Sequence, residues 1–120
     1  MERLDRITGW LIFGIGMLHC GVTFLLFKGY SDAAMWFFSG GLAMMYSAAL
    51  NLLRVRYADV APGLRRVCAA VNFSLLAFIV AYSADKGARI FWNFGAVTLI
   101  ICATAVTAFS LFRGRQAAQN

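Results

Sequence analysis

The sequence is short of charge, and its longest apolar stretches carry none. Asp, Glu, Lys and Arg make up 13% of the 120 residues, about half the share of roughly 25% that is usual in soluble domains. Hydrophobic residues make up 62%. A soluble chain of this length would leave too much apolar surface in water. We therefore predict a membrane protein and exclude an ordinary soluble domain.

The small numbers of cysteines and histidines, and the lack of catalytic motifs, limit the kinds of functional site that the chain can form. Its three cysteines are an odd number and include no C-x-x-C pair, so we expect buried, reduced thiols. Its single histidine could serve a bis-histidine haem only across a dimer. The sequence contains no phosphate loop, nucleophile elbow, paired carboxylate or H-E-x-x-H motif. We therefore predict that the protein is not an enzyme.

Four uncharged apolar stretches fill most of the chain. About 20 residues, with a rise of 1.5 Å each, cross a hydrocarbon core of about 30 Å. The connections between the stretches are short, which favours antiparallel neighbours. We predict one all-α domain over residues 1–120, an integral membrane four-helix bundle with up-down-up-down topology. The predicted spans are residues 9–27, 33–53, 67–83 and 90–112.

Basic residues are concentrated on one side of the predicted bundle. Eight of the 11 lie before the first span, around the second connection or after the fourth span, and three lie in the other two connections. Because loops rich in Lys and Arg stay in the cytoplasm, both termini are predicted to be cytoplasmic. This topology accounts for most of the net charge of +6. The expected partner of the basic ring is the headgroup layer of the lipid bilayer, and not nucleic acid.

His19 lies near the middle of the first predicted span. A side chain that can ionise at this depth must face the bundle interior or another subunit, and it is a functional candidate by default. No carboxylate lies within any span to offset the cost of charging the ring, so we expect a neutral imidazole at pH 7. One interpretation is a group that transports or binds a ligand. The other is a structural side chain that hydrogen-bonds to Thr23, a backbone carbonyl or another helix.

Soft side chains are expected at a similar depth. The second and fourth spans bring Met44 and Cys102 to this level, and thioether and thiol groups suit Cu(I) or haem iron. Methionine and cysteine are also common apolar fillers, and no pair has a diagnostic ligand spacing. We predict no cofactor, and name His19, Met44 and Cys102 as the residues that haem or copper would use.

Small and weakly polar residues recur at helical spacing in each span. Small residues let helix backbones approach closely, and polar ones form hydrogen bonds between helices. The predicted packing positions are Gly16, Gly40 and Ala43. In the fourth span the stripe consists of Asn93, Val97, Thr104 and Ala108. The candidate ligand or pathway residues are His19, Thr23, Ser47, Asn51, Asn72 and Asn93.

The three asparagines fall at different predicted depths. Asn51 lies near the cytoplasmic end, Asn72 somewhat deeper and Asn93 near the outer end, so all three cannot line one small site. Helix capping and hydrogen bonds between helices are one interpretation. The other is a polar pathway with His19 between Asn72 and Asn93.

Three short segments in the first half of the chain resemble a known group of proteins. They are GIGMLH at residues 14–19, WFFSGGL at 36–42 and NLL at 51–53, and they resemble small uncharacterised four-helix proteins of bacterial inner membranes. The resemblance implies a bacterial inner-membrane location and no particular activity. Small multidrug exporters have a similar length and number of spans. They carry a glutamate inside the first helix that is missing here, which argues against exchange of a drug for a proton.

Two classes of function follow. The first is a non-catalytic accessory or assembly subunit that acts through helix–helix contacts, as a homo-oligomer or within a larger membrane complex. The alternative is a small oligomeric transporter or channel with His19 in its polar pathway.

Overall fold

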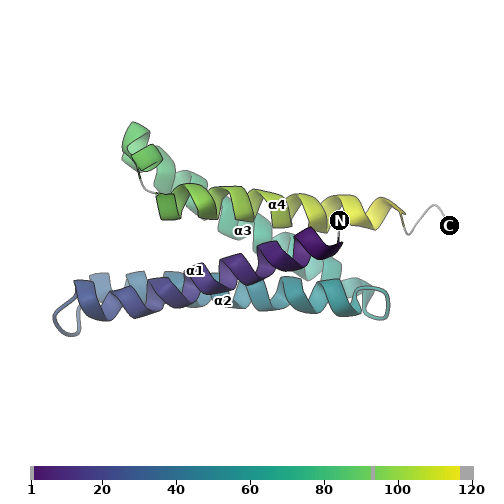
Figure 1. Ribbon diagram of the computed structural model, residues 1–120, viewed down its shortest axis with the longest axis horizontal. Coiled ribbons are helices and arrows are strands. Elements are labelled where there is room, and N and C mark those ends of the chain that lie inside the picture. Colours follow the sequence, from purple (N-terminus) through teal and green to yellow (C-terminus); the bar gives the residue numbers. More distant parts are fainter. Residues whose placement is uncertain (1, 93, 117–120) are drawn as a thin grey trace.

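The computed structural model describes residues 2–92 and 94–116, and its regular structure is entirely helical (Figure 1). All four α-helices are long and apolar enough to cross a membrane. The predicted all-α class is thereby confirmed. The elements are α1 (Glu2–Leu26), α2 (Asp32–Tyr57), α3 (Pro62–Lys86), the 3-10 helix η1 (Gly87–Trp92) and α4 (Phe94–Gln116).

Local sequence explains where the helices begin. The hydroxyl oxygen of Ser31 accepts a hydrogen bond of 3.2 Å from the backbone N–H of Ala34, so Ser31 caps the start of α2. Pro62 is the first residue of α3, where a missing N–H costs nothing and the fixed φ suits a helix. Gly29, in the turn before α2, has a φ of 105°, which glycine adopts without strain.

The helix limits differ from the predicted spans. α1 already begins at Glu2, and α3 continues to Lys86. A charged residue ends an apolar stretch but does not end a helix, because the backbone hydrogen bonds continue beyond the hydrocarbon core. In the fourth span, by contrast, the α-helix begins later than predicted. It was predicted from residue 90, but α4 begins at Phe94 and the preceding residues form η1.

The helices pack as two hairpins. α1 lies against α2 and α3 against α4, and further contacts join α1 to α4 and α2 to α3. Around the N-terminal part of α1 the four helices lie close together (Figure 1). Toward η1, the second hairpin diverges from the first (Figure 1). The two ends of the molecule therefore offer different surroundings to the side chains between the hairpins.

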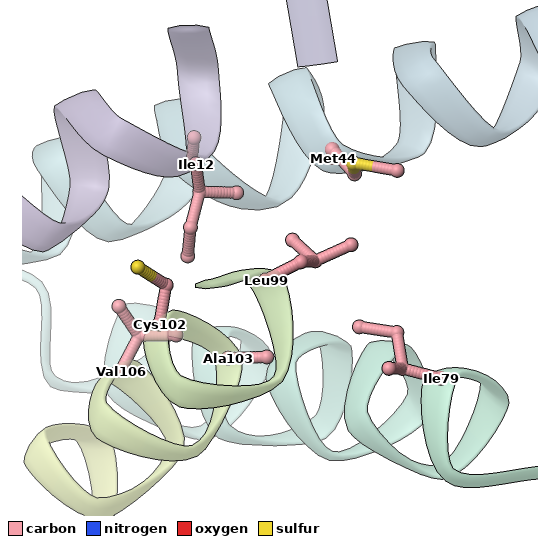
Figure 2. Close-up of a cluster of buried hydrophobic side chains, with 8 residues drawn as sticks. Ile12, Met44, Ile79, Leu99, Cys102, Ala103 and Val106 are labelled. Atoms are coloured by element: carbon pink, nitrogen blue, oxygen red, sulfur yellow. The ribbon is translucent and has the colours of Figure 1, made fainter. Parts of the chain in front are cut away.

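An apolar cluster joins the two hairpins midway along the helices. Figure 2 shows side chains from all four helices converging there, with the largest share from α4. These side chains make apolar contacts between the two hairpins. The cluster consists of Ile12, Met44, Ala48, Ile79, Leu99, Cys102, Ala103 and Val106.

The buried face of α4 differs from the predicted stripe. Thr104 is exposed, Val97 and Ala108 are only partly buried, and Asn93 lies outside the described residues. The correction has a simple physical reason. α4 is apolar on all sides, so hydrophobicity does not mark the side that faces the other helices.

α1 and α2 approach each other closely at Gly16 and Gly41. A Cβ atom added to Gly16 would lie 2.8 Å from the carbonyl oxygen of Gly41, and one added to Gly41 would lie 2.9 Å from that of Gly16. One of the predicted packing positions needs correction within this chain, because Ala43 is exposed. Gly40 is half-buried and faces α1, where an added Cβ atom would lie 3.6 Å from the ring of His19. Gly40 and Gly41 are adjacent, and the sequence does not show which of them meets the backbone of α1. The structure shows that Gly41 lies on the side of α2 that makes this backbone contact.

We expect Gly41→Ala to lower the stability of the folded protein by about 1–3 kcal/mol, because the added methyl group overlaps the backbone of α1. Gly14→Ala is the matched control. An atom added there meets nothing within 4 Å, so the substitution should be neutral or slightly stabilising. Thermal unfolding in detergent measures both. Equal Tm values for the two variants would contradict the close contact.

Candidate functional site

The most prominent polar feature is a buried ion pair between the beginning of α1 and the end of α2. One Nη atom of Arg54 donates to both carboxylate oxygens of Asp5, at 2.7 and 2.9 Å. The side chains are only 2% and 1% exposed. Removing two charges from water is costly, and their mutual attraction offsets this cost only when the geometry is good. The pair is therefore stable only while both side chains are held in place.

Asn51 connects the ion pair to the third helix. Its side-chain oxygen accepts hydrogen bonds of 3.3 Å from two nitrogens of Arg54. Its side-chain nitrogen donates to Asn72 of α3 at 2.6 Å, and the nitrogen of Asn72 donates back at 2.9 Å. The two amides thus form a reciprocal pair between α2 and α3.

Asn72 extends the network to α4. Its side-chain nitrogen donates to the hydroxyl of Ser110 at 2.9 Å and to the backbone carbonyl of Val106 at 3.3 Å. Its oxygen also accepts a hydrogen bond of 3.0 Å from the hydroxyl of Ser47. We call the six side chains the polar network, and it takes at least one member from each α-helix: Asp5, Ser47, Asn51, Arg54, Asn72 and Ser110.

The polar network satisfies its own hydrogen-bonding groups. Among the described residues, no buried side-chain nitrogen or oxygen lacks a partner. Leaving such a group unpaired would cost about 1–3 kcal/mol, and more for a charge. The network therefore specifies which faces of the four helices meet. Of the predicted candidates it unites Ser47, Asn51 and Asn72.

His19 lies elsewhere, at the contact between α1 and α2. Its ring stacks on that of Phe37, with ring centroids 3.7 Å apart and an angle of 16° between the planes. The ring is half-buried. Thr23 does not use its hydroxyl on the ring, because that group donates to the backbone carbonyl of His19 at 3.0 Å.

The apolar cluster separates His19 from the polar network. His19 and Phe37 lie two helical turns beyond Ile12 and Met44, on the same faces of α1 and α2. Ile12 and Met44 are both buried in the cluster (Figure 2). The described residues therefore do not connect Asn72 to His19 by a continuous polar path. Asn93, the outer member of the predicted pathway, lies outside them.

Of the three candidate metal or haem ligands, His19, Met44 and Cys102, the structure brings only the last two together. Met44 and Cys102 belong to the same apolar cluster, whereas His19 lies farther along α1. In the part of the chain that the structure describes, no group of three His, Cys, Asp or Glu side chains is placed to hold a metal ion. The geometry gives Met44 and Cys102 a packing role.

Asp5, Arg54 and Ser110 were not predicted as site residues. Charged residues bound the predicted spans, so the sequence pattern places Asp5 and Arg54 outside the bundle. A usable signal exists in the sequence. Asp5 lies close to the start of one helix and Arg54 close to the end of the next, so an antiparallel hairpin brings their opposite charges to one level. Ser110 has no such signal, because many hydroxyls of these helices bond only to their own backbone.

Comparisons with known protein families, curated proteins and solved structures found no significant match to this chain.

We expect that replacing either partner of the ion pair alone strongly lowers the stability of the folded protein. Asp5→Asn or Arg54→Met should each lower stability by about 3–5 kcal/mol, because each leaves a buried charge without its partner. The double variant should lose clearly less than the sum. Arg6→Gln is the control, because Arg6 pairs with Glu2 on the exposed side of α1 at 3.5 Å, where a pair is worth about 0–1 kcal/mol. Additive losses in chemical unfolding would contradict the ion pair.

Proposed function

We propose that the protein is a multi-pass protein of a bacterial inner membrane that acts as a non-catalytic accessory or assembly subunit. In this proposal the bundle is up-down-up-down, with both termini and the connection between α2 and α3 in the cytoplasm. The distribution of Lys and Arg supports this orientation. The resemblance of residues 14–19, 36–42 and 51–53 to small inner-membrane proteins supports the location.

The closed polar network is the observation that carries the proposed role. Its side chains bond to one another and to the backbone carbonyls of Ser47 and Val106, and so hold the chain's own helices in register. A bundle of this kind has an internally satisfied polar centre. Such a bundle is well suited to present fixed helix faces to neighbouring membrane helices.

The outward faces supply the contact surface that this role requires. On α1, Gly14 and Gly21 are exposed, and an atom added at either meets nothing within 4 Å. They are seven residues apart and therefore share one face. Exposed Met17 and Leu18 lie between them on the same side. Glycines on an outward face allow a second helix to approach closely in a membrane.

When solubilised in a mild detergent from the cells that make it, the protein should occur in a particle clearly larger than one copy, with its subunits in a fixed ratio. Gly14→Leu should reduce this assembly while leaving the Tm of the isolated chain unchanged, because the new side chain points away from its own helices. Ala77→Leu, at an exposed site on α3, is the matched control and should assemble normally. Light scattering after size-exclusion chromatography measures the mass.

A single copy as the only species under all mild conditions would contradict the accessory role. Normal assembly of Gly14→Leu would contradict the use of this face of α1.

A small oligomeric transporter or channel is the second candidate. The observation in its favour is the half-buried imidazole of His19 at the contact between α1 and α2. A histidine at this depth serves as a proton-linked or hydrogen-bonding group in transport proteins.

His19→Leu separates the two candidates. In an accessory subunit, it should cost about 0.6 kcal/mol, the typical value of one hydrogen bond inside a membrane, and assembly should persist. The measurements are Tm, particle mass and ion or proton flux into vesicles that contain the purified protein. A parent protein that conducts, together with a folded His19→Leu variant that does not, would favour the transporter and reject the accessory role.

A further inference from the structure

The turn between α2 and α3 has more arginines than acidic residues that could neutralise them. Four arginines belong to the turn and the flanking helix ends, namely Arg54, Arg56, Arg65 and Arg66. Asp5 neutralises Arg54 inside the bundle. Asp59 reaches Arg65 at 3.4 Å, but its side chain is 96% exposed, so water weakens this pair. The turn therefore retains a local excess of positive charge.

A small hollow opens at this turn. It measures about 20 Å³ and is lined by Arg54, Val55, Ala58, Asp59 and Arg65. This volume admits one water-sized group, such as a single oxygen atom of a phosphate. Arg65 lines the hollow and is partly buried, with 19% of its side chain exposed.

The depth of the hollow suits a lipid phosphate. It lies where α2 ends and α3 begins, next to the partly exposed Tyr57. Tyrosine at the end of a membrane span marks the headgroup layer. The start of α3 adds to the positive field, because no acidic residue occurs in its first turn and no side chain caps it. A guanidinium binds phosphate oxygens through two parallel N–H groups.

We propose that this hollow is a binding site for the phosphate of an anionic phospholipid, with Arg65 as the principal ligand and Asp59 as its internal competitor. One phosphate oxygen enters the hollow, and the guanidinium of Arg65 exchanges the carboxylate of Asp59 for the phosphate. The inference rests on the proposed membrane location but not on the accessory role. It goes beyond a basic ring that attracts lipid in general, since it assigns the contact to one arginine.

The test measures binding of phosphatidylglycerol to the purified full-length protein by native mass spectrometry. Phosphatidylcholine and inorganic phosphate are the comparison ligands. The parent protein should bind phosphatidylglycerol more tightly than phosphatidylcholine. Arg65→Gln should weaken this binding about tenfold, the size of one lost charge-assisted hydrogen bond. Arg56→Gln removes the same charge from the same end, but from an exposed residue outside the hollow, and should change binding less than about twofold.

Asp59→Asn provides a test with the opposite sign, because removal of the competing carboxylate should tighten binding of phosphatidylglycerol. Asp85→Asn, which raises the net charge equally at the other end of α3, should not. This comparison stands even if Arg65→Gln fails to fold.

Equal losses for Arg65→Gln and Arg56→Gln, or equal gains for Asp59→Asn and Asp85→Asn, would overturn the site. Displacement of the lipid by an equal concentration of inorganic phosphate would overturn the assignment to a lipid. These results leave the membrane location standing, whereas recovery of the protein outside the membrane fraction would overturn the location itself.

Discussion

The ion pair between Asp5 and Arg54, together with the amide pair between Asn51 and Asn72, determines how the four helices meet. Apolar contacts alone leave much freedom in a membrane, because lipid tails are as apolar as the leucine side chains that they replace. Hydrogen bonds in a low-dielectric interior are directional and costly to leave unmade. The polar network therefore fixes rotation and register, while the apolar cluster around Ile12 and Met44 fills the space that this register leaves.

The layers along the bundle follow from this arrangement. The polar network lies at the end where the N-terminus of α1 and the C-terminal part of α2 meet. The apolar cluster comes next, and the contact of Gly16 with Gly41 brings α1 and α2 together at its far edge. Beyond it along α1 and α2, His19 stacks on Phe37. Toward η1 the second hairpin diverges from the first (Figure 1), so the molecule is more open at that end.

The sequence predicted the four helices well, because long apolar stretches without charge are typical of helices that cross a membrane. For Asn51 and Asn72 the sequence left two interpretations open, a polar pathway or helix capping and hydrogen bonds between helices, and it did not indicate that the two amides would pair. The errors share one physical origin. Hydropathy measures transfer into lipid and does not distinguish the sides of a uniformly apolar helix, so the buried face of α4 was misplaced. It also excludes a charge such as Asp5 or Arg54, although two opposite charges that pair inside the bundle belong to its core.

The most direct test of the central role of the ion pair is a measurement of its geometry in a lipid bilayer. Solid-state NMR on protein labelled at the guanidinium nitrogens of arginine and the carboxyl carbon of aspartate reports their separation through dipolar coupling. The distances of 2.7 and 2.9 Å from an Arg54 nitrogen to the two Asp5 oxygens require a measurable coupling between that nitrogen and the Asp5 carboxyl carbon, which is lost in Arg54→Met while the Asp5 label remains. A spectrum without this coupling, or one in which Arg54→Met leaves it unchanged, would contradict the central place of the ion pair.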